Sequence, residues 1–292
     1  MSSTNTYTVT PLVNEHCATG ENPYWNPQDN CVYWTDIPNG KLFRYDTTTG
    51  EHAQIYQGVQ VGGFTLQENG DWLLFRVKDI AVLSPDGTVR TLLSFDDEGA
   101  DRFNDVIADP EGRVYAGTMG AARRPTGGLY RVDLDGTITK LWAGTSTANG
   151  MGFTPDLQHM YWTDSTAKRI YRYRYHRETG ELTDQTLFYQ ADPSEGTPDG
   201  LVVDTEGNVW SARHRGSAIL KHAADNGRVV QRITLPVARV TSQIFGGPDL
   251  DTLYVTTAGG GEPEAREEDG TLYRVTGLGA RGQAEFRSRV RG

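Results

Sequence analysis

The sequence predicts an all-β protein, a six-bladed β-propeller that forms a single domain over residues 1–292. The first observation is an internal repeat of 40–50 residues made of short strands and turns, which is typical of propeller blades. The second is that the strands alternate apolar and polar residues, as in residues 41–45 and 169–173. The third is that 34 residues are glycine, whereas no long apolar stretch has the 3.6-residue period of a helix.

Each repeat begins with a turn signal of the Pro-Asp-Gly type, followed by an aromatic-rich strand, a short polar turn and a second strand. Six copies follow one another, at residues 25–45, 63–75, 108–132, 153–173, 203–210 and 245–275. One equivalent strand position holds Trp34, Leu74, Tyr115, Trp162, Trp210 and Tyr254. These residues lie 40, 41, 47, 48 and 44 positions apart, and we expect such aromatic residues to pack between blades.

The two ends of the chain are predicted to meet in one blade. Residues 7–13 and 284–290 both resemble strands, and placing them in the same blade would close the ring. Closure would protect the sheet edges that an open ring leaves exposed.

The chain is acidic, with a formal net charge of −10 and a pI near 5.1. A nucleic-acid-binding protein usually carries a basic surface, so we expect no nucleic-acid partner. No apolar run could span a membrane, and residues 1–10 lack the pattern of a signal peptide, so we expect a cytoplasmic protein without a membrane partner. Cys17 and Cys31 are expected to be reduced thiols, with one disulfide between them as the alternative. The sequence does not indicate an oligomeric state.

Four polar residues occupy equivalent places just before the first strand of separate blades. They are Glu21, Asn104, Asn149 and Asp199, in the segments 18–25, 101–106, 147–153 and 196–202. We expect all four to point into one end of the central channel, where two carboxylates and two amides would suit Ca²⁺, Mg²⁺ or Mn²⁺. The lack of His or Cys at these positions argues against zinc. Alternatively, Asn149-Gly150 and Asp199-Gly200 are ordinary turn dipeptides.

Four motifs in the same order resemble those of the gluconolactonase and regucalcin (senescence marker protein) family of sugar lactonases. They are Gly20-Glu-Asn-Pro-Tyr-Trp25, Arg102-Phe-Asn-Asp105, Asn149-Gly150 with the later Thr154-Pro-Asp156, and Pro198-Asp-Gly200. The resemblance covers essentially the whole chain. It implies a divalent-metal-dependent hydrolase that opens a sugar (aldono)lactone to the aldonic acid.

The resemblance also implies roles for individual residues. Glu21, Asn149 and Asp199 would bind the metal, and Arg102 and Asn104 would contact the substrate. Ca²⁺ is the first choice of metal, and Mn²⁺, Zn²⁺, Mg²⁺ and Fe²⁺ remain open. The metal would polarise the lactone carbonyl, and Asp199 would act as general base on the attacking water. A serine-esterase mechanism is disfavoured because the Gly-x-Ser-x-Gly motif is absent from the sequence.

Departures from the family pattern concern substrate recognition. Asn22 and Val106 replace glycines, and the segment after Ala116-Gly-Thr-Met119 lacks the acidic residue that contacts substrate in regucalcin. We therefore expect metal binding to be retained and substrate recognition to differ. Four further charged or titratable residues are candidates for the rim of the site, namely Arg123, Arg124, His214 and Arg215. Alternatively, they are exposed charges on loops.

Two functions besides lactone hydrolysis remain open. One is the metal-dependent hydrolysis of another activated ester, such as an organophosphate. The other is a non-catalytic propeller that binds a ligand and holds a metal only as a structural plug. Arg102 favours a catalytic site, since a plug would not require it, although an ion pair of Arg102 with Asp101 or Asp105 is the alternative.

Overall fold

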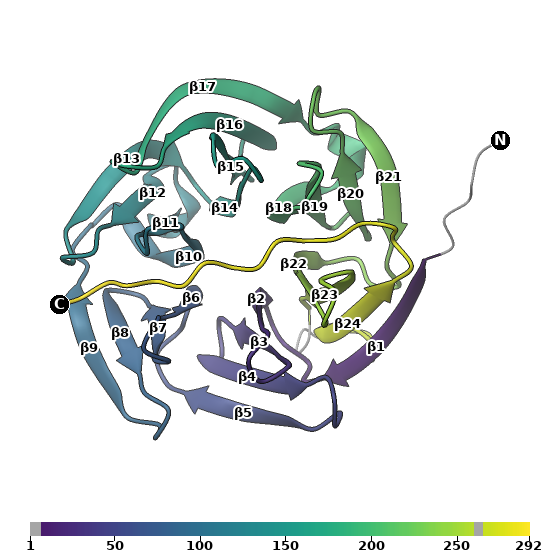
Figure 1. Ribbon diagram of the computed structural model, residues 1–292, viewed down its shortest axis with the longest axis horizontal. Coiled ribbons are helices and arrows are strands. Elements are labelled where there is room, and N and C mark those ends of the chain that lie inside the picture. The colour runs from purple at the N-terminus through teal and green to yellow at the C-terminus, as the bar shows by residue number, and fades with distance from the viewer. Residues whose placement is uncertain (1–6, 260–264) are drawn as a thin grey trace.

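The computed structural model describes residues 7–259 and 265–292, and its six four-stranded antiparallel sheets form a ring (Figure 1). The predicted six-bladed β-propeller is therefore confirmed. The described part of the chain has no α-helix, only the short 3-10 helices η1 (Ala121–Arg123) and η2 (Pro193–Glu195). Among these residues, no helix has the length and apolarity needed to cross a membrane.

The first three blades follow one another along the chain, and each is a four-stranded meander. Blade 1 contains β2 (Gly20–Asn26), β3 (Cys31–Asp36), β4 (Lys41–Asp46) and β5 (His52–Gln57). Blade 2 contains β6 (Gly63–Leu66), β7 (Trp72–Phe75), β8 (Asp79–Leu83) and β9 (Val89–Ser94). Blade 3 contains β10 (Ala100–Ala108), β11 (Val114–Gly120), β12 (Gly127–Val132) and β13 (Ile138–Thr145).

The remaining blades repeat this order, and the last one is completed by the N-terminal strand. Blade 4 contains β14 (Ala148–Phe153), β15 (His159–Asp164), β16 (Arg169–His176) and β17 (Glu181–Gln190). Blade 5 contains β18 (Thr197–Val203), β19 (Val209–His214), β20 (Ala218–His222) and β21 (Val229–Thr234). Blade 6 contains β22 (Val240–Gly246), β23 (Thr252–Thr257), β24 (Thr271–Thr276) and β1 (Thr8–Asn14).

The core lies between neighbouring blades, as the repeated aromatic positions predict. The six equivalent residues, which lie in the second strand of each blade, are at most 4% exposed. Trp25 of blade 1 stacks on Tyr254 of blade 6, with ring centroids 5.8 Å apart. Trp72 of blade 2 meets Tyr24 and Tyr33 of blade 1 at 5.4 and 4.5 Å. These contacts fix each sheet against the next and so hold the innermost strands in register around the axis.

The N-terminal strand closes the ring. β1 pairs antiparallel with β24, with Thr8 opposite Thr276 and Asn14 opposite Thr271. Blade 6 is therefore built from both ends of the sequence, so opening the ring requires breaking a complete strand pair. Cys17 and Cys31 are both buried and free, so the alternative disulfide does not form.

The C-terminal segment differs from the prediction, because residues 284–290 do not form a strand of that blade. β1 already occupies the free edge of β24, which leaves no place there for a second terminal strand. Instead, residues 277–292, called the C-terminal strap below, cross one face of the ring (Figure 1). Isolated bridges join Gly282 to Asp204 and Ser288 to Gln67, which ties the strap to blades 5 and 2.

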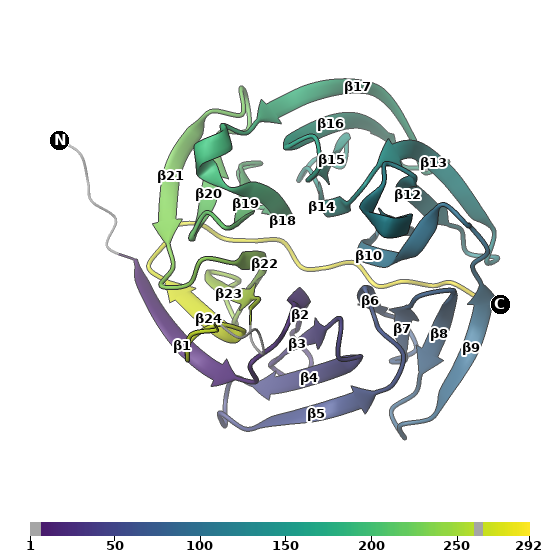
Figure 2. The same ribbon diagram turned by 180° about the vertical axis from the view of Figure 1, so that it is seen from behind.

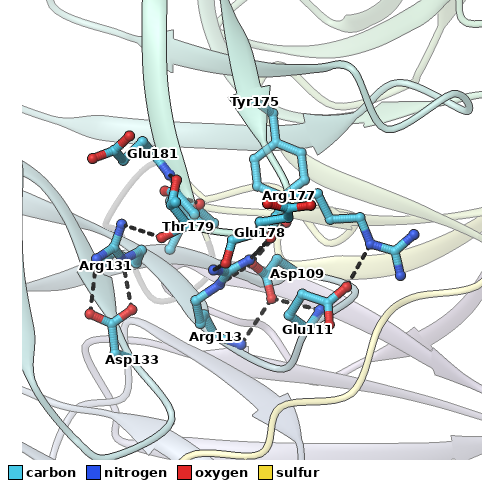
Figure 3. Close-up of polar contacts among 12 residues, drawn as sticks. Asp109, Glu111, Arg113, Arg131, Asp133, Tyr175, Arg177, Glu178, Thr179 and Glu181 are labelled. Atoms are coloured by element: carbon cyan, nitrogen blue, oxygen red, sulfur yellow. Dashed lines mark hydrogen bonds and ion pairs between the residues drawn. The ribbon is translucent and has the colours of Figure 1, made fainter.

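A buried ion pair joins blades 3 and 4 on the same face (Figure 3). Arg113 Nε lies 2.6 Å from Asp109 Oδ2, and Asp109 is fully buried. The Tyr175 hydroxyl donates to Asp109 Oδ2 at 2.9 Å, and Arg113 Nη1 donates to the Glu178 carbonyl at 3.2 Å. The turn that ends β10 is thus connected to the turn between β16 and β17.

Candidate functional site

The predicted site residues all lie in innermost strands, at the end of the ring opposite the C-terminal strap. Glu21, Asn149 and Asp199 lie near the start of β2, β14 and β18, and Asn104 lies in the middle of the longer strand β10. The sequence predicted these residues just before the first strands. The structure shows that they lie within those strands. The strap contacts the turns at the other ends of these strands, such as those at Gly112 and Thr205. Figure 2 shows the site face of the ring, with η1 and η2 toward the viewer.

A β-bulge accompanies each site residue. The pairing of the first strand with the second shifts register in β2 after Glu21, in β10 after Phe103, in β14 after Asn149 and in β18 after Pro198. Of the two innermost strands that carry none of the four residues, β6 pairs with β7 without a shift, and β22 pairs with β23 with a shift between Val240 and Ser242. A bulge re-aims side chains and ends regular pairing, so it can turn these polar groups toward the axis of the ring.

Gly150 and Gly200 belong to these strands and are not turn residues. A side chain on Gly150 would meet the backbone oxygen of Asp199 and the nitrogen of Leu201, both at 2.5 Å. A side chain on Gly200 would meet Ser242 Oγ at 2.1 Å. The alternative that Asn149-Gly150 and Asp199-Gly200 are turn dipeptides is therefore wrong. Glycine is needed because adjacent innermost strands approach each other closely there.

A chain of hydrogen bonds connects blades 3, 4 and 5 at the site. Arg102 Nη1 donates to Asn104 Oδ1 at 2.6 Å, and Asn104 Nδ2 donates to Asn149 Oδ1 at 2.9 Å. Asn149 Nδ2 donates to Ser165 Oγ at 3.0 Å, and that hydroxyl donates to the Pro198 carbonyl at 2.7 Å. Asn149 Oδ1 has a second lone pair, so it can accept from Asn104 and still serve as a ligand.

The two carboxylates of the predicted set are buried and lie close to a third one. Glu21 is 6% exposed and Asp199 is 7% exposed. Burial raises the pKa of Glu21 well above its ordinary value, and the charges of Asp199 and Asp105 raise it further. Burial and the charge of Asp105 likewise raise the pKa of Asp199. The charge of Arg102 lowers both pKa values but does not offset these effects, so both carboxyls would resist full ionisation without a further positive charge.

The carboxylate of Asp199 tests whether the predicted metal ligands fit a cation. Asp199 Oδ1 is buried and has no hydrogen-bond partner among the described residues. A buried oxygen without a partner, next to another buried carboxylate, is stabilised by a positive ion. Glu21, Asn149 and Asp199 thus present the hard oxygen donors that Ca²⁺, Mg²⁺ and Mn²⁺ prefer.

The ligand set differs from a cluster of acidic or imidazole side chains. In residues 7–259 and 265–292, no group of three or more His, Cys, Asp or Glu side chains is arranged to hold a metal. The predicted ligand set of Glu21, Asn149 and Asp199 has an amide as its third member, so it falls outside this class of cluster. Such a set leaves coordination positions for water or substrate.

Arg102 does not form the ion pair considered as its alternative role. Within the described chain it has no salt bridge to Asp101 or Asp105, and its Nη1 instead donates to Asn104 and to the Phe103 carbonyl at 2.8 Å. Burial lowers the pKa of Arg102 to about 10, while the charges of Glu21 and Asp101 act in the opposite direction. Its remaining guanidinium donors are therefore available to a bound molecule.

Sequence reasoning missed three supporting residues, namely Asn22, Asp105 and Ser165. Asp105 stands inside the Arg-Phe-Asn-Asp motif, yet its proximity to the other carboxylates appears only in the fold. Burial raises its pKa to about 6, and hydrogen bonds from the Val106 backbone and Asn22 act against that rise. Ser165 carried no signal, because its partners Asn149 and Pro198 lie on other strands.

The channel beneath the site is closed by the strap. Two small cavities, of about 40 and 30 Å³, lie between the innermost strands and the strap residues Glu285 and Phe286. Met151, Val202 and Ile244 line both cavities. Volumes of this size admit water and exclude a sugar, so a substrate must approach from the site face.

Comparisons with known proteins identify the family of this chain. Residues 19–259 match the family described as SMP-30/Gluconolactonase/LRE-like region. The chain is 42% identical to the pentonolactonase XacC of Haloferax volcanii, over 97% of this chain and 99% of that protein. It is 31% identical to the regucalcin of Xenopus laevis, over 94% of this chain and 95% of that protein.

Solved structures share the whole fold. A luciferin-regenerating enzyme superposes with a TM-score of 0.91 at 27% identity, covering 98% of this chain and 100% of that chain. A calcium-binding regucalcin from Agrobacterium tumefaciens superposes with a TM-score of 0.85 at 25% identity, covering 96% and 95%. The chain therefore belongs to the SMP-30/gluconolactonase/LRE-like family.

Proposed function

We propose that this protein is a metal-dependent hydrolase of sugar lactones, with its reaction centre at Asp199. The observation that carries the proposal is the buried Asp199 Oδ1, which lies beside Glu21 and has no hydrogen-bond partner in the described part of the chain. The name of the relative XacC, a pentonolactonase, and the gluconolactonase in the name of the matching family support the same class of reaction.

The chain's own residues would divide the work as follows. Arg102 would orient the substrate through the guanidinium donors that it does not give to Phe103 and Asn104. Asn104 would contact the substrate through its amide oxygen, because both of its amide hydrogens are donated to Ala148 and Asn149. Asp199 would take a proton from the attacking water while the oxygen of that water forms a bond to the carbonyl carbon. When the ring C–O bond breaks, Asp199 would return that proton to the leaving ring oxygen, which yields the open hydroxy acid.

Glu21, Asn149 and Asp199 would hold the divalent ion, for which Ca²⁺ is the first choice. A bound divalent ion supplies polarisation of the carbonyl and stabilisation of the negative charge that develops on its oxygen. Its positive charge would also keep Glu21 and Asp199 ionised, opposing the effects that raise their pKa.

The Asp199→Asn variant tests the proposal. The amide cannot accept the proton, so we expect kcat on five- and six-membered aldonolactones to fall by about 10²–10⁴-fold, measured in a pH-stat above the spontaneous rate. Metal content, measured on the same preparation, should be retained in part because the amide still offers an oxygen ligand. Asp225→Asn, in an exposed turn on the strap face, removes the same charge and should leave turnover unchanged.

Metal dependence is tested on the wild-type protein. Chelation should abolish turnover, and adding back Ca²⁺, Mn²⁺, Mg²⁺, Zn²⁺ or Fe²⁺ should restore it to different degrees. Full activity in the chelated protein would refute the metal's role. No hydrolysis of any lactone with any ion would refute the function itself and favour another activated ester or a ligand-binding propeller.

A further inference from the structure

The turn between β11 and β12 brings a second arginine to the site face. Arg102 on β10 pairs with Met119 on β11, and η1 begins two residues later. Arg123 is the last residue of η1, which Figure 2 shows on the site face of the ring. Arg123 is therefore four residues after Met119, the residue that pairs with Arg102, and one tight turn connects the two.

This turn is held in place by the backbone of the preceding loop. The Ala121 nitrogen and the Thr126 hydroxyl both donate to the Gly99 carbonyl, at 2.9 and 2.7 Å. Ala122 and Arg123 nevertheless have left-handed backbone angles, with φ of 52° and 55°. Residues other than glycine adopt this region rarely and at a cost in stability. The surrounding contacts therefore hold the backbone of Arg123 in this conformation.

Neither guanidinium group, that of Arg102 or that of Arg123, is paired with a carboxylate at salt-bridge distance within the described residues. The charges of Glu21, Asp101 and Asp199 act on Arg102 from farther away. The charge of Arg123 is close enough to lower the pKa of Arg102, after the larger effect of burial. Adjacent like charges repel, and an anionic group bound by both would relieve that repulsion.

We propose that Arg123 makes the site select lactones that carry a second, anionic group, a carboxylate or a phosphate, away from the ring ester. This inference rests on the proposed lactone hydrolysis and specifies its substrate class. The planar guanidinium fork matches the oxygens of both anionic groups. Arg102 and Arg123 would bind that group on the site face, while the ester lies at Asp199. Bond making and breaking remain those of lactone hydrolysis.

The experiment compares three lactone classes on the wild-type protein: neutral aldonolactones, lactones with a free carboxylate, and phosphorylated aldonolactones. We expect kcat/KM for at least one anionic class to exceed that for the neutral class by about tenfold or more, the scale of a charge-assisted hydrogen bond. The preference should shrink as salt is added. The anionic class with the higher kcat/KM identifies the group.

Substitutions at Arg123 assign the preference to its side chain. Arg123→Gln should lower kcat/KM for the preferred anionic lactone by about tenfold more than for the neutral one, mainly through KM. Arg123→Lys should keep part of the preference because it keeps the charge. Arg123→Gly should lose the preference and gain stability, since glycine adopts φ of 55° without strain. Arg228→Gln, in an exposed turn of the opposite face, is the charge-matched control.

The outcomes separate this inference from the proposed function. A wild-type protein that hydrolyses neutral lactones as well as anionic ones would overturn the inference and leave lactone hydrolysis standing. The same holds if Arg123→Gln lowers kcat/KM for all three classes equally. Failure to hydrolyse any lactone would instead refute the proposed function. Inhibition by the open-chain product of the anionic lactone gives a test that does not depend on turnover. Weaker inhibition of the Arg123→Gln variant than of the wild-type protein supports the inference.

Discussion

Asn22 lies where the family pattern has glycine, and its backbone explains why few residues fit there. Its φ is 46°, in the left-handed region that asparagine tolerates better than other side chains. Its Oδ1 accepts from the Phe64 nitrogen at 2.6 Å, and its Nδ2 lies 3.3 Å from Asp105 Oδ1. The side chain thus joins blade 1 to blades 2 and 3 beside the predicted metal ligand Glu21.

Replacing Asn22 by glycine should therefore destabilise the protein. The backbone remains unstrained, but Phe64 loses the acceptor for its nitrogen and Asp105 loses a donor. We expect Asn22→Gly to lower the free energy of unfolding by about 1–3 kcal/mol in urea titrations. Asn30 has a similar φ of 54° but an exposed side chain, so Asn30→Gly should have little effect. Equal losses in the two variants would show that the side-chain bonds of Asn22 do not stabilise the fold.

At the scale of single residues, the sequence predicted which side chains gather but not what supports them. Glu21, Asn104, Asn149 and Asp199 could be found because each occupies the same place in a repeat. Ser165 could not, because its role depends on the close approach of β14 and β18. Contacts between blades join residues far apart in the chain, and no local pattern records them.

The turn between β10 and β11 is an element stabilised by one arginine. Arg113 fills the space beside Gly180 of blade 4 and pairs with Asp109 (Figure 3). Both Arg113 and Asp109 are almost completely buried. A buried ion pair adds little compared with an apolar pair, but removing one partner leaves the other charge uncompensated.

Arg113→Ala should therefore cost about 3–5 kcal/mol of unfolding free energy, measured by urea denaturation. Arg177→Ala is the matched control, because Arg177 forms an ion pair with Glu111 in which the side chains are 55% and 36% exposed. We expect the control to lose about 0–1 kcal/mol. A small loss in Arg113→Ala would mean that water reaches Asp109 and replaces the guanidinium.

At the scale of elements, the strands were predictable and their bulges were not. Alternation and turn residues identify the strands of the repeat. The register shifts after Glu21 and Asn149 are properties of a strand pair, so neither strand alone indicates them. These shifts decide where the side chains point, and this is why the site residues were expected before the strands rather than within them.

For the whole molecule, the strap is the feature that the sequence did not predict. Residues 284–290 have the alternation of a strand, but the only free edge in blade 6 is taken by β1. The strap instead spans the ring, with hydrogen bonds from Thr205 to Arg281, from Ser288 to Leu66 and from Arg289 to Gly112. It thereby connects blades 5, 2 and 3 and places Glu285 in the channel beneath the site.

Glu285 makes the stability of this closure depend on pH. Burial raises its pKa to about 7, and the charge of Asp105 contributes to the rise. Because this pKa lies above the ordinary 4.5, the folded protein holds the proton more tightly than the unfolded chain. The resulting stabilisation is complete below about pH 4.5 and is lost as the pH rises through about 7.

Glu285→Gln, which stays neutral, should remove this dependence. In chelator-treated protein at about pH 8, the variant should be more stable than wild type by up to about 3 kcal/mol, the free energy that corresponds to raising the pKa from 4.5 to about 7. The two proteins should converge near pH 4, where Glu285 is protonated in both states. Glu68→Gln, an exposed change on the strap face, should give a difference that does not vary with pH. If Glu285→Gln also gives a constant difference, the Glu285 carboxyl is hydrated in the folded protein and the strap does not seal the channel.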